Sequence, residues 1–196
     1  MLPVGEIGDK FWKWLFEIDV RIGRLVAVEG CRHCGGPLHR GDYPRKPRGG
    51  PFTVAEEAFS SRISYCCGWR GCRRRATPPS VRFLGRRVYL GVAVVVAGVL
   101  ARAAATAAEI KRRTAIPPRT VERWRAWWQT GFVESRLFAE QRARFMPPLE
   151  LAGLPVTLLE RFAIAGEAGA LVRTCAFLAP LTTGSVADGS RFVRLG

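Results

Sequence analysis

The cysteines of this 196-residue chain fall into two close groups whose spacing is suited to a metal ion. Cys31 and Cys34 enclose two residues and are followed by two glycines, which let the backbone turn around the sulfur atoms. The second group is Cys66-Cys67-Gly-Trp-Arg-Gly-Cys72, which is also rich in glycine. Two such groups can supply the four thiolates of a tetrahedral zinc site, and four protein ligands leave no open position for catalysis. We therefore expect a structural Zn²⁺ ion.

Of the adjacent Cys66 and Cys67, only one can face such a site if both lie on a strand. Neighbouring side chains of a strand point to opposite faces, and Cys67 falls on the same side as Ile63 and Tyr65. This alternation favours Cys67 as the ligand. The predicted metal ligands are Cys31, Cys34, Cys67 and Cys72.

Other potential ligands have simpler interpretations. His33 and His39 could replace a cysteine, but we interpret them as surface groups or as neighbours of the ligands. Cys175 lies far away in an apolar segment, which indicates a small core residue. The alternative for the whole set is reduced, buried cysteines without a metal. The polar, glycine-rich surroundings of the two groups would make a poor apolar core, which disfavours that alternative.

A second motif runs from Ala107 to Trp128 and has the pattern of two short helices joined by a tight turn. In the second helix, Val121, Trp124 and Trp128 share one face. Arg119 and Arg123 lie almost opposite that face, where they could bind guanine edges in the DNA major groove. The simpler alternative is an amphipathic helix with a solvated basic face. The residues predicted to contact bases are Arg119, Thr120, Glu122 and Arg123.

The formal net charge is +15, and the excess is concentrated in the ranges 32–87 and 102–128. Such an excess adds nothing to the stability of a fold, so it indicates a polyanionic partner. A GC-rich genome would explain the preference for Arg over Lys, but not the excess of basic over acidic residues in two segments. The residues expected to contact phosphates are Arg45, Lys46, Arg48, Arg73, Arg74, Arg75, Arg86 and Arg87.

The hydrophobic pattern predicts an α+β fold that is mostly helical, with a zinc ribbon inserted between helices and followed by a helix-turn-helix unit. Two helices are expected before Gly30, and loops with short strands after it, including a strand from Phe59 to Cys67. Three helices are expected between Val88 and Trp128, and another from about Phe132 to Arg144. The expected domains are N-terminal helices (1–30), a zinc ribbon-like basic domain (31–87), a helix-turn-helix domain (88–145) and a helical tail with a flexible end (146–196).

Both motifs resemble regions of a known class of DNA-binding proteins. The run Glu109-Ile110-Lys111-Arg112-Arg113, followed by Arg119-Thr120-Val121-Glu122-Arg123-Trp124, resembles the helix-turn-helix of insertion-sequence transposases and related recombination proteins. The upstream cysteines resemble the zinc-binding domain that precedes it in several of those families. The sequence differs from that pattern at Ala115, where the turn usually carries Gly, and at Lys111, where a small residue is common. The resemblance covers about residues 31–128 and implies DNA binding in a mobile element.

Catalytic constellations are not evident in the sequence. The residues after Trp128 are too few for a ribonuclease-H-type domain with its metal-binding carboxylates. All three tyrosines precede the helix-turn-helix motif, which argues against a tyrosine recombinase. We therefore expect a binding protein that is not an enzyme by itself.

The expected function is sequence-specific DNA binding for a mobile genetic element, as an accessory or truncated transposase-like protein without a catalytic domain. Double-stranded DNA is the expected partner, with a separately encoded recombinase or transposase as a further candidate. A transcriptional regulator with the same modules and an RNA-binding zinc-ribbon protein are the alternatives. The apolar stretch Val88–Ala101 is shorter than the roughly 20 residues that span a bilayer, and no secretory signal is evident. We therefore expect a cytoplasmic, nucleoid-associated protein without a membrane partner, whose oligomeric state the sequence leaves open.

Overall fold

The computed structural model describes residues 9–45, 60–84, 89–102, 105–114, 116–163 and 166–183. The fold is α+β and mostly helical, which confirms the predicted class. The helices are α1 (Asp9–Glu29), α3 (Gly91–Arg102), α4 (Ala107–Thr114), α5 (Pro118–Gln129), α6 (Arg136–Gln141), α7 (Val156–Arg161) and α8 (Gly166–Leu178), with 3-10 helices η2 (Arg142–Arg144), η3 (Leu151–Gly153) and η5 (Ala179–Thr182). The strands are β1 (Leu38–Arg40), β2 (Tyr43–Pro44), β3 (Ser61–Arg62), β4 (Tyr65–Cys67), β5 (Arg75–Ala76), β6 (Phe83–Leu84) and β7 (Tyr89–Leu90).

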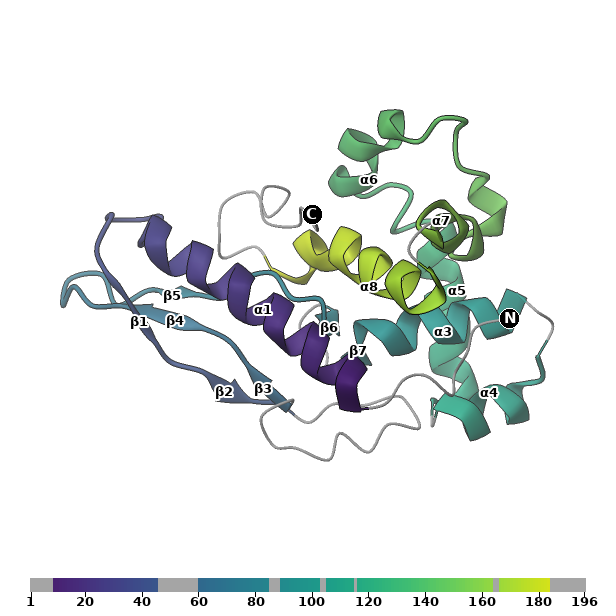
Figure 1. Cartoon of the computed structure of the whole chain (residues 1–196), viewed down its shortest axis with the longest axis horizontal. Coiled ribbons are helices and arrows are strands. Elements are labelled where there is room, and N and C mark those ends of the chain that lie inside the picture. Colours follow the sequence, from purple (N-terminus) through teal and green to yellow (C-terminus); the bar gives the residue numbers. More distant parts are fainter. Residues whose placement is uncertain are drawn as a thin grey trace.

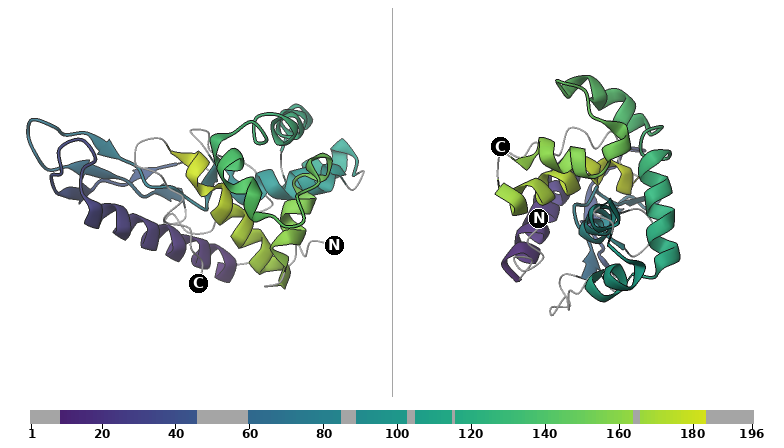
Figure 2. Two further views of the ribbon diagram at one scale, coloured as in Figure 1. Left: turned by 90° about the horizontal axis from the view of Figure 1, so that it is seen from above. Right: turned by 90° about the vertical axis from the view of Figure 1, so that its right-hand side faces the viewer.

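The molecule is elongated. Strands β1, β4 and β5, with α1 running alongside them, form one end, and helices α3–α8 form the other (Figures 1 and 2). Both ends therefore share α1 as a structural element.

Helix α1 is one continuous helix of 21 residues, where the sequence was interpreted as two. Its buried positions, which include Leu15, Ile18, Ile22 and Val26, follow the spacing of a single helical face. The helix ends at Glu29, and Gly30 follows with φ +76°, the left-handed conformation that commonly terminates a helix. The predicted stop at Gly30 is thus confirmed.

The sheet that follows α1 is small and antiparallel, with strand order β1-β4-β5. Leu38 pairs with Cys67, and Tyr65 pairs with Ala76. Strands β2 and β3 form a separate two-stranded ladder, so the expected strand from 59 to 67 is interrupted at residues 63 and 64. Residue 59 lies outside the described residues. A minor apolar cluster of Val26, Ile63, Tyr65 and Ala76 joins this sheet to the second half of α1.

The major apolar core surrounds α3, whose side chains from Val92 to Ala97 are at most 1% exposed. Helix α3 contacts α4, α5, α7 and α8. The apolar stretch of the sequence is thus a buried helix, as expected. Two further helices follow it as predicted, α4 and α5. Helix α6 begins later than expected, because Ser135 caps its N-terminus by accepting a hydrogen bond from the backbone N–H of Phe138.

The segment after residue 145 takes part in this same core. Leu154, Leu158 and Leu171 are buried in it, together with Phe11 and Leu15 of α1. Cys175 is 2% exposed and lies in it as well, as predicted. The four-part division of the chain remains a prediction, and the end of the tail that was predicted to be flexible lies outside the described residues. Within the part of the chain described here, no helix is long and apolar enough to cross a membrane.

Candidate metal centre

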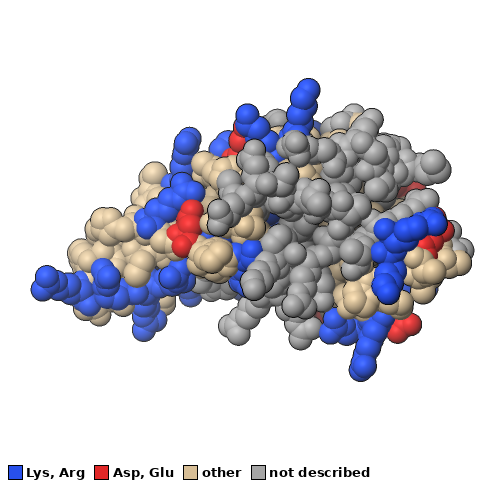
Figure 3. Space-filling model, turned by 90° about the horizontal axis from the view of Figure 1, so that it is seen from below, with Lys and Arg blue, Asp and Glu red and all other residues tan. Residues whose placement is uncertain are grey.

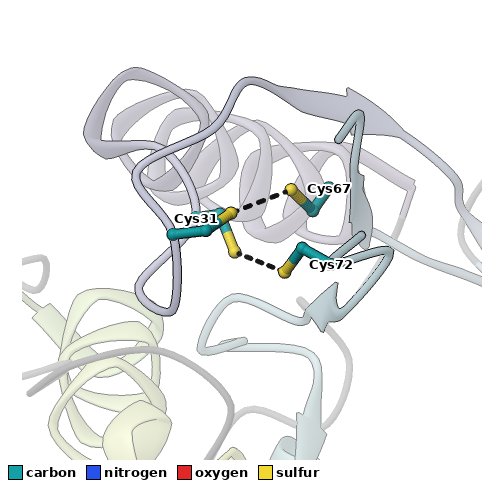
Figure 4. Close-up of side chains that lie close together, drawn as sticks. Cys31, Cys67 and Cys72 are labelled. Carbon is teal, nitrogen blue, oxygen red and sulfur yellow. Dashed lines mark hydrogen bonds between the residues drawn. The ribbon is translucent and has the colours of Figure 1, made fainter. Parts of the chain in front are cut away.

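Four cysteine thiols meet beside the C-terminal end of α1. The sulfur atoms of Cys31, Cys34, Cys67 and Cys72 all lie within 4.8 Å of one another. The Sγ–Sγ distances are 3.6 Å between Cys31 and Cys72 and 3.4 Å between Cys34 and Cys67 (Figure 4). A tetrahedral ion with metal–sulfur bonds of about 2.3 Å requires sulfur atoms about 3.8 Å apart. The cluster could therefore hold one metal ion.

The first cysteine pair is held by a tight turn. The backbone N–H groups of Cys34 and Gly35 both donate to the carbonyl of Cys31, at 3.2 and 2.7 Å. Gly35 has φ +69°, a conformation that glycine adopts without steric cost. The N–H of Cys31 donates to Gly36 O at 2.9 Å and closes the loop. The sequence Cys-x-x-Cys-Gly-Gly thus folds so that both thiols point to the same side.

The second pair contains the same kind of turn, but the turn begins at Trp69, two residues after Cys67. Here the N–H groups of Cys72 and Arg73 donate to the carbonyl of Trp69, at 3.0 and 3.1 Å. Arg73 has φ +47° and occupies the position that Gly35 has in the first turn. Trp69 therefore occupies the position of Cys31, while Cys67 comes from the end of β4. This explains how four intervening residues still bring Cys67 and Cys72 together.

The alternation along β4 selects Cys67 over Cys66. Cys67 is fully buried, whereas Cys66 is part-exposed and its thiol donates to Arg73 O at 3.3 Å. His33 and His39 are exposed, and neither belongs to a group of possible metal ligands within the described ranges. His33 instead lies 3.2 Å from Arg74, between Nδ1 and Nη1.

The four thiols differ in their ease of ionisation. A hydrogen bond from the backbone of His33 is the main cause that lowers the pKa of Cys31 to about 7. The backbone amide of Gly36 lowers the pKa of Cys34, but burial and the neighbouring thiols together raise it to about 12. Burial also raises the pKa of Cys67. Without a cation, adjacent thiolates would repel one another, so full ionisation of the cluster requires a metal ion.

Helix α5 carries the residues predicted to contact bases. Its back is buried at Val121 and Trp128, which are 5% and 1% exposed. Arg119, Glu122 and Arg123 are exposed, as the helical wheel suggests. Thr120 is not: it is 6% exposed, and its hydroxyl accepts a hydrogen bond from Arg123 at 3.3 Å. Thr120 lies next to Val121 at the edge of the buried face, and its contact with bases remains a prediction.

The residues predicted to contact phosphates are only partly described. Arg73 and Arg74 are exposed. Arg75 is exposed too, but it donates to Gly41 O at 2.9 Å and to Ser64 Oγ at 3.0 Å. Arg45 lies with its guanidinium 5.1 Å from the ring centre of Tyr43. The predictions for Lys46, Arg48, Arg86 and Arg87 fall outside the described residues.

Basic side chains gather at the end of the molecule that carries the cysteine cluster and again at the end that carries α4 (Figure 3). Arg32 and Arg70, which were not among the predicted phosphate contacts, are also exposed in the two cysteine loops. Their position inside the loops, between paired cysteines, was the available signal.

Comparisons with known proteins identify no relative. No family model matches the sequence, and neither curated proteins nor solved structures show significant similarity to the chain.

Proposed function

We propose that this chain is a zinc-stabilised, sequence-specific DNA-binding protein that serves a mobile genetic element without catalysing the DNA reaction itself. In this proposal residues 31–87 form a zinc ribbon, and α4 and α5 form a helix-turn-helix in which α5 reads bases. The ribbon arginines position the protein on phosphates. A separately encoded recombinase or transposase would supply the chemistry.

The observation that carries the proposal is the division of α5 into two faces. Val121 and Trp128 anchor the helix to the core, while Arg119, Glu122 and Arg123 remain exposed. Because Arg123 donates to Thr120, its guanidinium is held near the start of the helix. In helix-turn-helix proteins the N-terminal residues of the second helix contact base edges, and arginine makes the commonest specific contact, to guanine.

The proposed identity of the metal follows from ligand chemistry. Four thiolates in a tetrahedral arrangement suit Zn²⁺, and a site closed by four protein ligands is structural. We expect about one zinc per chain in protein purified without chelator, measured by elemental analysis. Replacing Cys34 or Cys72 by Ser should remove the metal, whereas a metal-free wild-type protein would contradict the ribbon.

The role in a mobile element rests on the resemblance of the cysteine loops and of residues 107–128 to transposase DNA-binding regions. Selection of bound duplexes from a random pool tests this role. A defined motif that recurs at the ends of mobile elements would support it. A motif found in promoters would indicate a transcriptional regulator, and preference for structured RNA over duplex DNA would contradict the proposal.

Variants can separate base reading from phosphate contact. Arg123→Ala should cost about 1–3 kcal/mol on the selected site and much less on random duplexes. The control is Arg136→Ala, which removes an exposed helical arginine from α6 that pairs with Glu140. Arg136→Ala should change neither the affinity for the selected site nor the affinity for random duplexes. If Arg123→Ala weakens every duplex equally, α5 does not read the sequence.

The ribbon arginines should behave differently. Arg73→Gly with Arg74→Ala should weaken binding to all sequences alike. The combination should lower the salt slope by up to about 2, because each phosphate contact contributes about 0.9. Arg75 is left intact, because its hydrogen bonds to Gly41 and Ser64 support the sheet. If the salt dependence of binding is unchanged in this variant, Arg73 and Arg74 do not contact the DNA phosphates.

A further inference from the structure

Trp69 is a large aromatic side chain that the fold leaves open to solvent. It lies in the loop between Cys67 and Cys72, and 55% of the residue's surface is exposed. Its carbonyl accepts the backbone hydrogen bonds of Cys72 and Arg73, so the backbone at this position belongs to the turn beside the cysteine cluster. The exposed ring is thus carried by a firmly held loop.

One side of this ring already has a structural role. A Cβ atom placed on Gly36 would lie 3.0 Å from Cγ and Cδ2 of Trp69 and 3.2 Å from Sγ of Cys67. The indole therefore rests on the backbone of the first cysteine loop and orients itself there. This contact explains how the ring is positioned, but more than half of its surface remains available to a partner.

The surroundings of Trp69 are cationic. Arg70, Arg73 and Arg74 follow it in the same loop, Arg32 lies in the facing cysteine loop, and all four are exposed. The ranges 31–41 and 60–84 contain neither Asp nor Glu. An aromatic ring among arginines fits a partner that combines flat, apolar rings with negative charge. Nucleic acid has this combination, since its bases stack on aromatic side chains while its phosphates bind arginine.

We propose that Trp69 stacks on an unpaired base of DNA whose phosphates contact the arginines of the two cysteine loops. Bases inside a duplex are stacked on both neighbours, so an indole on a surface loop can reach only a base in a single strand or at a junction. The site lies at the end of the molecule opposite α4 and α5 (Figure 1). It rests on the proposed DNA binding and extends it with a second site, for a single-stranded segment.

Equilibrium binding of the full chain to a 20-nucleotide single strand and to the matching duplex tests this site. Trp69→Ala should weaken single-strand binding about 5- to 150-fold, which corresponds to about 1–3 kcal/mol for one stacked base. Duplex binding should change little, and Trp69→Phe should retain most of the affinity. The control is Trp14→Ala, which removes another exposed tryptophan, 40% exposed, from the first half of α1. It should leave both affinities unchanged.

Two further measurements keep the test decisive. Metal content is determined for each variant, because the Trp69 ring lies against Gly36, next to the sulfur of Cys67. If Trp69→Ala loses the metal, tryptophan fluorescence decides: the single strand should quench it in the wild type and not in metal-loaded Trp69→Phe.

The two proposals fail in different ways. A wild type that binds neither single strand nor duplex overturns the proposed function together with this site. Sequence-specific duplex binding with single-strand affinity that is independent of Trp69 overturns this site alone. Equal loss for Trp14→Ala, or stronger Trp69-dependent binding to anionic lipid vesicles than to the single strand, also overturns it.

Discussion

At the residue scale, adjacent cysteines of β4 have different surroundings. Cys67 is buried among the cluster thiols, whereas the thiol of Cys66 contacts only the carbonyl of Arg73 among the hydrogen bonds described here. Cys66→Ser should therefore keep one metal per chain, and Cys67→Ser should lose it together with the folded sheet. Elemental analysis and circular dichroism of the two variants check this. Metal loss in Cys66→Ser alone would identify Cys66 as the ligand and shift the register of β4 by one residue.

The reactivity of the remaining thiols offers a separate prediction. Burial raises the pKa of Cys175 to about 12, so at pH 8 this side chain is almost entirely a thiol, and the thiolate is the reactive form. In the folded, metal-loaded protein an alkylating reagent should therefore modify Cys66 and leave Cys175 unmodified. Mass spectrometry of the labelled peptides reads this out. Rapid labelling of Cys175 before unfolding would contradict its place in the core.

Arg73 has a backbone conformation that favours glycine. Its φ of +47° costs a non-glycine residue about 1–2 kcal/mol, while glycine loses about 0.5–1 kcal/mol more chain entropy on folding. Arg73→Gly should therefore leave stability unchanged or raise it by up to about 1.5 kcal/mol. Thermal unfolding measures the effect, and Arg74→Gly, at the next position with no positive φ, should instead destabilise. Clear destabilisation by Arg73→Gly would show that its side chain supports the turn.

How far the sequence predicts these residues depends on the range of their contacts. The four cysteines could be chosen because loop spacing and strand alternation are local properties. The burial of Thr120 was not predictable, because a helical wheel gives the direction of a side chain but not the depth of the neighbouring helices. The conformation of Arg73 was not predictable, since the second turn starts at Trp69 and not at a cysteine.

At the element scale, a buried ion pair fixes α1 to the segment before β6. Asp19 accepts hydrogen bonds from Ser80 Oγ at 2.6 Å, from the N–H of Val81 at 2.8 Å and from Nε of Arg82 at 2.7 Å. The side chains of Asp19 and Arg82 are 1% and 0% exposed. Arg82 also donates to Ser61 O at 2.9 Å, which extends the network to β3. The ion pair thus connects the helix to both parts of the molecule.

Loss of the Asp19 charge should be costly. Asp19→Asn leaves the guanidinium of Arg82 buried without its counter-ion, a change that typically destabilises by about 3–5 kcal/mol. The control is Glu140→Gln, which breaks the surface pair Arg136–Glu140 and should cost only about 0.3–0.5 kcal/mol. Urea unfolding compares the two variants. Similar small effects would mean that water reaches Arg82 and that the pair does not hold α1.

From the sequence, the need of Asp19 for a buried partner could be predicted, but the identity of that partner could not. Asp19 stands among the buried positions Leu15, Ile18 and Ile22 of α1, and an acidic residue there requires a buried partner. The partner lies 63 residues further along the chain, and no local pattern relates the two. The continuity of α1 was missed for a similar reason. Its two halves pack against different cores, so the apolar positions in the sequence were interpreted as two separate helices.

At the scale of the whole molecule, these two cores differ greatly in size. The major core joins the first half of α1 to α3 and α8, with fully buried side chains such as Leu15, Val95 and Leu158. Among the described residues, the buried members of the minor core are Val26, Ile63, Tyr65 and Ala76. So small a core contributes little stability, and in such units a structural metal usually supplies the difference.

Removal of the proposed metal should therefore unfold the sheet at one end of the molecule and leave the helices at the other end folded. With a chelator, amide hydrogens in residues 31–45 and 60–77 should lose protection against exchange, while those of α3 and α8 should keep it. Helix α1 should divide along its length: its N-terminal half stays protected by the major core, and the turn around Val26 becomes exposed. Mass spectrometry of exchanged peptides, with and without added Zn²⁺, measures this pattern. Simultaneous loss of protection in α3 and α8 would contradict it, because the metal would then stabilise the whole chain as one cooperative unit through α1 and the Asp19–Arg82 pair.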